Sequence, residues 1–299
     1  MERRRFITTT LLASGAVALG LSPNRFAQTK PGKYHLRYAP HLTILNRELT
    51  IPQRLDLIAE HGFDATEYNG LLNHPLNEVE EIRKKLDSLR IEMGIFVANP
   101  GGWKTAGLVD PKQRDAFLQE IKKTIEYHKV IGNHSVTTLT GPAMLGVSRS
   151  SQRRSAIEGL KRAAELLEKT ELALVVEPLN HIDHPGFFMT HSDELAEIIA
   201  AVNSKHARML FDLYHLQITE GNLINNFRAY VDLVGYIQTG DVPGRKEPGT
   251  GEVNYRNVLK AIYDAGYRGI IGLEHGTSIA GREGVLKMFE AYKKADAWD

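Results

Sequence analysis

Four oxygen-bearing side chains each stand at the end of a short apolar run in the second half of the chain. They are Glu177 in LVVEPLN, Asp212 in MLFDLYH, Gln238 in GYIQTGD and Glu274 in IIGLEHG. Three carboxylates on one buried face would repel one another, and a carboxylate is costly to remove from water without a partner. A cation among them relieves that cost, and an all-oxygen set favours Mg²⁺ or Mn²⁺. We therefore expect these four residues to bind one divalent metal ion. The competing interpretation is that each of them caps a helix or pairs with a nearby Arg or Lys.

A metal site of this kind suits an isomerisation in which one proton moves between adjacent carbons through an enediolate. The metal holds the substrate oxygens and stabilises the developing negative charge. A carboxylate removes the proton from one carbon, and its conjugate acid or a second carboxylate returns it to the other. Glu177 and Glu274 are the expected acid and base. Which of the two acts first stays open.

Three further residues are expected to bind the substrate. His215 lies shortly after Asp212 and could donate a hydrogen bond to a substrate oxygen, the alternative being a hydrogen-bonded surface histidine. Arg245 follows Gln238 in the segment DVPGR and suits recognition of a carboxylate or a sugar hydroxyl. Glu67 ends an earlier apolar run in ATEYNG, where a loop-stabilising carboxylate is an equal alternative.

Weaker candidates lie in two loops. Trp103 in NPGGWKTAG is either a lid aromatic or a packed loop anchor. The loop after Glu177 contains four polar residues, one of which could contact the substrate: Asn180, His181, Asp183 and His184.

The elements that must position these residues alternate along the chain. From His35 onward, short apolar runs alternate with longer amphipathic ones, giving eight strand–helix units in about 265 residues, the size of one (β/α)₈ TIM barrel. A doubly wound sheet is the competing fold, but its glycine-rich turn is missing, because the first strand leads into APHLTILN. In a barrel the carboxyl ends of the strands form the active face. The four strand-end residues are therefore expected to meet there.

The first thirty residues differ in kind from the rest. They have a basic start, an apolar run from about Phe6 to Leu21 and then a polar break, which is the shape of a secretory signal. The run RRRFI resembles the twin-arginine export motif. We expect residues 1–30 to be an export segment that carries the protein through the twin-arginine (Tat) translocase to the periplasm, and residues 31–299 to be the barrel. An uncleaved, membrane-anchoring N-terminus is the alternative.

The composition excludes some classes of site. The chain has no cysteine, which rules out disulfides, thiolate metal sites and cysteine nucleophiles. A formal net charge of +1 gives no reason to expect a nucleic-acid partner. The clusters of basic residues lie among helix-forming residues and are expected to be solvated helix faces: Arg83–Lys85, Arg153–Arg154 and Lys161–Arg162. A homo-oligomer is compatible with the sequence.

Four segments together resemble the hydroxypyruvate isomerase family of xylose-isomerase-like TIM barrels. They are EPLN followed by HPGFF, FDLYHLQITEGNL, GYIQTGDVPGRKEPGTGEVNY and GYRGIIGLEHG. The resemblance implies that Glu177, Asp212, Gln238 and Glu274 bind one divalent metal. It also implies a substrate role for His215. The related ketose 3-epimerases typically have a histidine in place of Gln238, so glutamine indicates the hydroxypyruvate-isomerase-like group.

The resemblance implies a metal-dependent isomerase with a small hydroxy-ketoacid or sugar as substrate, and hydroxypyruvate to tartronate semialdehyde is the named reaction. A ketose 3-epimerase or a keto-sugar or inosose dehydratase would use the same enediolate. A periplasmic sugar-binding barrel without turnover is the alternative from another class, and the presence of both glutamates argues against it. A barrel endonuclease would need a histidine-rich site for several metals and a basic groove, and neither is evident in the sequence.

Overall fold

The computed structural model describes residues 34–45 and 48–298. The predicted export segment lies outside these residues, and the boundary between it and the barrel stays a prediction. Among the described residues, no helix combines the length and apolarity needed to cross a membrane.

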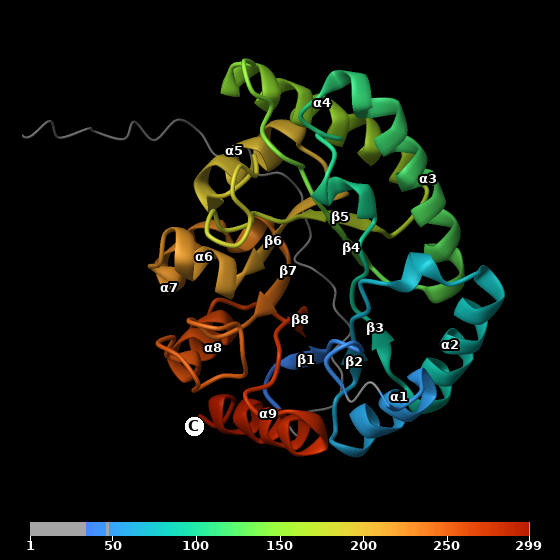
Figure 1. Cartoon of the computed structure of the whole chain (residues 1–299), viewed down its shortest axis with the longest axis vertical. Coiled ribbons are helices and arrows are strands. Elements are labelled where there is room, and N and C mark those ends of the chain that lie inside the picture. The colour runs from blue at the N-terminus through green and yellow to red at the C-terminus, as the bar shows by residue number, and fades with distance from the viewer. Residues whose placement is uncertain (1–33, 46–47, 299) are drawn as a thin grey trace, which may run out of the picture.

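Eight parallel strands form the centre of the fold. Their bounds are β1 Arg37–Pro40, β2 Ala65–Thr66, β3 Glu92–Met93, β4 Ser135–Thr138, β5 Ala173–Val176, β6 Ala207–Asp212, β7 Val234–Thr239 and β8 Ile270–Leu273. Six of them pair in the order β1-β8-β7-β6-β5-β4, and β2 pairs with β3. Figure 1 shows the strands gathered in the middle of the molecule.

Two isolated parallel bridges join the two sheets into one ring. His41, just after β1, pairs with Glu67, just after β2, and Val97, after β3, pairs with Thr137 in β4. The backbone hydrogen bonds at the first junction run from Glu67 to Pro40 and from Leu42 to Glu67. The strands therefore form a closed (β/α)₈ barrel, which confirms the predicted fold.

Nine α-helices surround the strands in the described chain (Figure 1). Their bounds are α1 Ile51–Glu60, α2 Leu76–Leu89, α3 Arg114–Ile131, α4 Arg149–Leu167, α5 Ser192–Val202, α6 Leu213–Thr219, α7 Leu223–Tyr230, α8 Tyr255–Asp264 and α9 Gly281–Ala295. Local sequence sets their ends. Thr50 and Gln53 form a capping box at the start of α1, and Gly132 ends α3 in the left-handed conformation with a φ of 73°.

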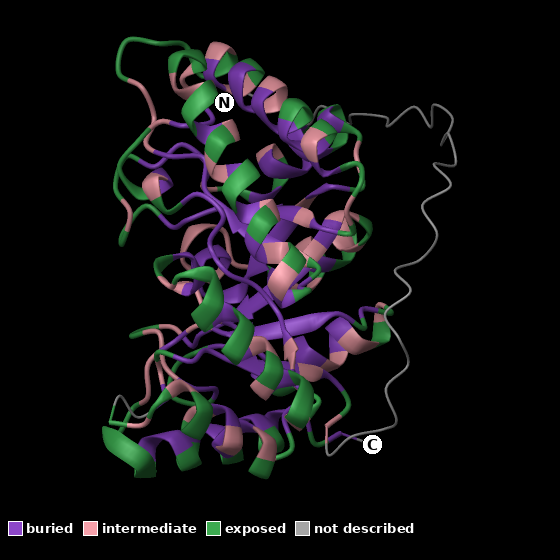
Figure 2. Ribbon diagram, turned by 90° about the vertical axis from the view of Figure 1, so that its right-hand side faces the viewer, coloured by how far each residue is buried: buried purple, intermediate pink, exposed green. Residues whose placement is uncertain are grey.

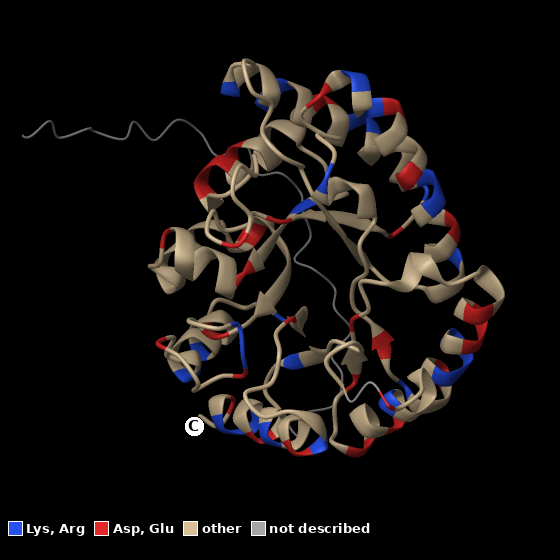
Figure 3. Cartoon of the chain, in the orientation of Figure 1, with Lys and Arg blue, Asp and Glu red and all other residues tan. Residues whose placement is uncertain are grey.

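Burial follows the layers of the barrel. The strands are almost wholly buried, and the helices are buried on their inner faces and exposed on their outer faces (Figure 2). Most charged residues lie on the helices (Figure 3). Arg83, Lys84 and Arg162 each make an ion pair within their own helix, with Asp87, Glu81 and Glu158. The basic clusters that contain these residues thus lie on solvated helix faces, as predicted.

Candidate functional site

The predicted strand-end residues meet at the carboxyl ends of neighbouring strands. In the sheet register, Asp212 of β6 lies opposite Gln238 of β7, and Gln238 lies opposite Gly272 of β8. Glu177 directly follows β5, and Glu274 directly follows β8. The side chains of Glu177, Asp212 and Gln238 are buried, and that of Glu274 is 22% exposed. The register of four consecutive strands therefore brings these residues to one end of the barrel.

Asp212 uses its two carboxylate oxygens for two purposes. Its Oδ1 accepts a hydrogen bond of 2.8 Å from the backbone N–H of Tyr214 and so caps α6. Its Oδ2 lies 2.8 Å from Nη2 of Arg245. The same Nη2 lies 2.6 Å from Oε2 of Glu274, whose Oε1 accepts a hydrogen bond of 2.5 Å from Asn69. The guanidinium of Arg245 therefore sits between two strand-end carboxylates.

Glu177, Asp212 and His215 form the one group of three acidic or histidine side chains, among the described residues, whose ligand atoms all lie within 4.8 Å of one another. Nε2 of His215 is 3.6 Å from Oε1 of Glu177 and 3.5 Å from Oδ2 of Asp212. Burial, together with the carboxylates of Glu274 and Asp212, raises the pKa of Glu177 well above its ordinary value. Burial lowers the pKa of His215 to about 3. Glu274 is not part of this group.

Glu67 lies at the wall of the barrel behind Gln238. Its carboxylate is fully buried and accepts hydrogen bonds from Nε2 of Gln238, at 3.4 and 3.3 Å, and from the hydroxyl of Tyr236 at 3.3 Å. Burial, and next the nearby charge of Glu274, raise the pKa of Glu67 well above its ordinary value. Gly272 makes room for this carboxylate, because a Cβ there would come within 2.0 Å of Oε2 of Glu67. Glu67 is thus enclosed among the strands, and its predicted contact with substrate stays a prediction.

The loop that carries Arg245 is built around the buried side chain of Asp241. The carboxylate of Asp241 accepts backbone hydrogen bonds of 2.9 to 3.1 Å from four residues of the same loop: Val242, Gly249, Gly251 and Val253. The ring of Tyr214 packs under the Arg245 guanidinium at 4.9 Å. The position of Arg245 is therefore set by a fixed loop and not by a flexible surface segment.

Aromatic side chains lie beside this site. Trp103, in a 3₁₀ helix at Pro100–Trp103, has its ring 5.2 Å from that of His184, in the loop after β5. The ring of His184 in turn lies 5.4 Å from that of His215. Trp103 is 43% exposed. This geometry places Trp103 at the rim of the site, in contact with one of the polar residues of the loop after Glu177.

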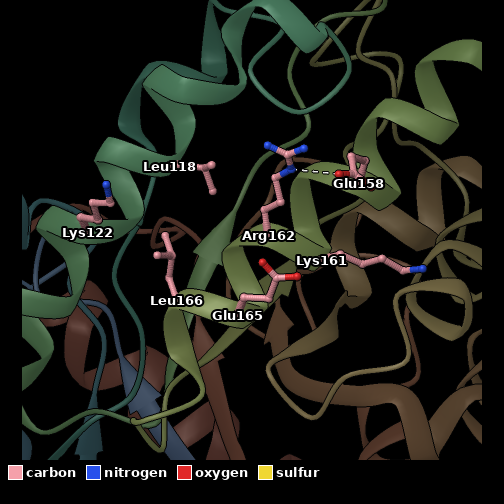
Figure 4. A pocket seen from close by; sticks show the side chains of 7 residues that line it. All are labelled: Leu118, Lys122, Glu158, Lys161, Arg162, Glu165 and Leu166. Carbon is pink, nitrogen blue, oxygen red and sulfur yellow. Dashed lines mark hydrogen bonds and ion pairs between the residues drawn. The ribbon is translucent and has the colours of Figure 1, made fainter.

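A groove of about 440 Å³ lies elsewhere, between α3 and α4 on the outside of the barrel (Figure 4). It is lined by Leu118, Lys122, Glu158, Lys161, Arg162, Glu165 and Leu166. Figure 4 shows the ion pair between Arg162 and Glu158, which lie four residues apart in α4. The groove brings together none of the strand-end residues.

Residues 55–295 match the profile of the family described as the xylose isomerase-like TIM barrel. The chain belongs to this family. Hydroxypyruvate isomerase of Escherichia coli (strain K12) is 30% identical over 261 residues, covering 86% of this chain and 100% of the relative. The 2-oxo-tetronate isomerase of Cupriavidus necator is 31% identical over 242 residues, covering 80% of this chain and 92% of the relative. The crystal structure of an AP endonuclease, family 2, from Brucella melitensis matches with a TM-score of 0.76 at 25% identity, covering 84% of this chain and 96% of that chain.

This xylose isomerase-like TIM barrel is an isomerase, because the two relatives of about 30% identity that cover 80% or more of its length are a hydroxypyruvate isomerase and a 2-oxo-tetronate isomerase. The family resemblance found in the sequence is thereby confirmed at the level of the fold and the enzyme class.

Sequence reasoning missed several residues of the site. Asn69 hydrogen-bonds Glu274, and His41 accepts a hydrogen bond from the backbone N–H of Asn69 at 3.3 Å. His41 directly follows β1 but carries no side-chain oxygen, and Asn69 lies three residues beyond β2, so the pattern that found Glu177 does not identify them. Asp241 stands within a motif quoted for the family resemblance, but its four backbone contacts could not be read from its spacing.

The strand-end residues fit a divalent metal ion. Oε1 of Glu177 and Oε1 of Gln238 are buried without a hydrogen-bond partner, and such orphaned acceptors are costly. Asp212 and Glu274 already share one cation, the guanidinium of Arg245. Together with the two unpartnered oxygens, these two carboxylates make a donor set suited to a hard cation.

Proposed function

We propose that this barrel is a metal-dependent isomerase that moves a proton between adjacent carbons of a small hydroxy-ketoacid or sugar through an enediolate. The interconversion of hydroxypyruvate and tartronate semialdehyde is the reaction we propose first, since a hydroxypyruvate isomerase matches 86% of the chain. The observation that supports the proposal is the meeting of Glu177, Asp212, Gln238 and Glu274 at one end of the barrel, with orphaned oxygens among them.

Glu177, Asp212, Gln238 and Glu274 would hold one Mg²⁺ or Mn²⁺ ion. When bound, such an ion polarises the substrate carbonyl and stabilises the negative charge of the enediolate. Arg245 would then be released from Asp212 and Glu274 to bind a carboxylate or hydroxyl of the substrate.

Glu177 and Glu274 would transfer the proton. One carboxylate accepts the proton from the carbon beside the carbonyl, and the electrons of that C–H bond form the enediolate double bond. The other glutamate, or the first in its protonated form, returns a proton to the adjacent carbon, so the step needs no oxidant or reductant.

The proposal extends to location and partners. The twin-arginine pattern in residues 1–30 supports transit through the Tat translocase to the periplasm. There the protein would meet sugars or sugar acids, without a nucleic-acid partner, as a monomer or a homo-oligomer. Cell fractionation of the tagged full chain, with Arg3 and Arg4 replaced by Lys as control, tests export.

Proton NMR in D₂O tests the reaction. The purified protein with Mg²⁺ is given hydroxypyruvate, 2-oxo-tetronate and a panel of ketoses, with and without chelator. We expect deuterium to enter next to a carbonyl only with metal. Glu177→Gln and Glu274→Gln should each lower the rate by about 10²-fold or more. The exposed Glu252→Gln variant, in the loop of Arg245, should match wild type.

Each other result points to a named alternative. A product inverted at C3 would identify a ketose 3-epimerase, and loss of water would identify a dehydratase. Tight metal and sugar binding without deuterium entry on any substrate would contradict an enzyme and favour a binding barrel.

A further inference from the structure

The side-chain amide of Asn180 has only one orientation that satisfies its neighbours. Its Oδ1 accepts hydrogen bonds from the backbone N–H groups of Ile182 and Asp183, at 3.0 and 2.8 Å. Backbone N–H groups only donate, so the oxygen must face them. Its Nδ2 therefore points the other way, where it donates to Oδ2 of Asp183 at 3.0 Å and lies 2.8 Å from Nδ1 of His215.

Nδ1 of His215 faces a second donor as well. The backbone N–H of Asn180 points at the same ring nitrogen from 3.2 Å. A ring nitrogen that receives two N–H donors acts as an acceptor and carries no proton. This excludes the imidazolium and the Nδ1–H tautomer, so the single ring proton is on Nε2.

Nε2 of His215 is the ring atom that faces the candidate site. The side chain is 1% exposed, and Nε2 has no hydrogen-bond partner. It lies 3.6 Å from Glu177 Oε1 and 3.5 Å from Asp212 Oδ2, both longer than an ordinary hydrogen bond. An N–H at this place is free to donate to an atom that enters between the two carboxylates.

A protonated ring nitrogen cannot coordinate a metal, because its lone pair carries the proton. Glu177, Asp212 and His215 lie close enough to resemble a three-ligand site. The hydrogen bonds behind the ring, however, remove His215 from that set. A metal ion would then be bound by the oxygen donors, and His215 would contact the substrate.

We propose that Asn180 is a positioning residue that fixes His215 in the Nε2–H tautomer, so that His215 donates a hydrogen bond to a substrate oxygen and does not bind the metal. The inference rests on the proposed function for the identity of the acceptor, an oxygen that gains negative charge in the enediolate. A donor aimed at such an oxygen stabilises the transition state more than the ground state.

The group that supports Asn180 is also in place. Asp183 Oδ2 accepts from Nδ2 of Asn180 and from the hydroxyl of Tyr214 at 2.7 Å. Hydrogen bonds from Asn180 and Tyr214 lower the pKa of Asp183. The ring of Tyr214 packs edge-on against His215, with centroids 5.3 Å apart. Asp183 thus fixes the side chain of Asn180, and the ring of Tyr214 packs against that of His215.

Long-range ¹H–¹⁵N NMR of the ¹⁵N-labelled protein reads the tautomer directly, without turnover. The signals of His215 among the 12 histidines are assigned by their loss in His215→Gln. We expect a protonated Nε2 and an unprotonated Nδ1, both in chelator-treated protein and with Mg²⁺ added. A proton on Nδ1, or loss of the Nε2 proton when Mg²⁺ is added, would overturn the proposal.

Two variants separate positioning from support of the fold. Asn180→Asp keeps the shape and the acceptor oxygen but replaces the NH₂ donor by an acceptor, so Nδ1 of His215 should gain a proton. Turnover should fall by about 10- to 100-fold, with Mg²⁺ affinity unchanged. Asp183→Asn, the matched control, leaves the NH₂ of Asn180 in place and should keep the wild-type tautomer.

An unchanged tautomer in Asn180→Asp would show that the side chain does not set it. If that variant fails to fold, the wild-type spectrum still decides which nitrogen carries the proton. An Nε2–H tautomer in a protein that shows no deuterium exchange would contradict the proposed function and leave the tautomer assignment standing.

Discussion

Gln238 is the neutral member of the four strand-end residues, and its neighbour Glu67 determines which end of its amide faces the site. The NH₂ group donates to the Glu67 carboxylate, so the oxygen points away from it and has no partner among the described residues. An amide in the opposite orientation would bring its oxygen against a carboxylate. Glu67 therefore lies behind the proposed metal ligand Gln238, where partners of metal ligands are commonly found.

A charge swap tests this arrangement. Gln238→Glu places a second carboxyl group against Glu67, and we expect it to lower the unfolding free energy of the metal-free protein by about 1–3 kcal/mol. Adding Glu67→Gln restores one amide and one carboxylate, so the double variant should recover most of that loss and bind Mg²⁺. Denaturant unfolding and calorimetric Mg²⁺ titration measure both effects. A double variant less stable than Gln238→Glu would contradict the pairing.

At the residue scale, the sequence predicted the four strand-end residues and, as substrate contacts, Glu67, His215 and Arg245. Glu177 and Asp212 were found because an acidic residue after an apolar run is unusual. The contact of Asn69 with Glu274 joins residues 205 positions apart, and that of Asn180 with His215 joins residues 35 apart. Such pairs depend on the register of the ring, which no local pattern contains.

At the scale of elements, the segment between β7 and α8 has a fixed shape and carries Arg245. No residue other than glycine fits at position 251, because a Cβ there would lie 2.0 Å from the carbonyl oxygen of Val242. Asn254 caps α8 by accepting a hydrogen bond from the backbone N–H of Asn257. The side chain of Glu252, by contrast, is exposed and accepts a hydrogen bond of 3.1 Å from Nε2 of Gln217. Asp241 is the side chain that holds the loop together.

Asp241→Ala tests that role. Four backbone N–H groups would lose their acceptor, and we expect a loss of about 3 kcal/mol in unfolding free energy. Because the same loop presents Arg245, kcat/KM should fall as well. Urea unfolding and steady-state kinetics measure the two effects, with Glu252→Ala as the control in the same loop. Equal unfolding free energies for the two variants would show that Asp241 does not organise the loop.

At the scale of the whole molecule, a buried histidine links three elements. His275 follows Glu274 and points away from it, as the alternation of side chains along a strand predicts. Its Nδ1–H donates to the carbonyl of Gly276, and the hydroxyl of Tyr292, in α9, donates to Nε2 at 2.8 Å. Tyr292 also contacts Thr239 of β7. Burial lowers the pKa of His275 from its ordinary value of 6.5 to about 4.

This pKa predicts an acid-sensitive stability. Between pH 6.5 and 4 the unfolded chain binds a proton at this histidine and the folded chain does not, so stability falls as the pH falls through that window. The contribution is about 3 kcal/mol. Wild type should therefore lose more unfolding free energy than His275→Gln between pH 7 and pH 4, as measured by urea unfolding. Parallel pH profiles for the two proteins would contradict the assignment.

The sequence predicted the barrel as a whole because its signals repeat. The predicted alternation of eight strand–helix units is observed, because each of the eight strands is followed by at least one helix before the next strand or the end of the described chain. The short length of β2 and β3 was not predicted.

That short pairing has a mechanical consequence. The six strands from β4 round to β1 pair with one another over several residues each. The pair β2 and β3, by contrast, is joined to them only by the single bridges His41–Glu67 and Val97–Thr137. Local unfolding should start at these two bridges. Backbone amides of β2 and β3 should therefore exchange with solvent sooner than those of β6 and β7. Glu67 belongs to one of these bridges, and its carboxylate accepts a hydrogen bond from Gln238 of β7. Filling the site with Mg²⁺ should therefore slow exchange in β2, far along the chain from the strands that supply its ligands.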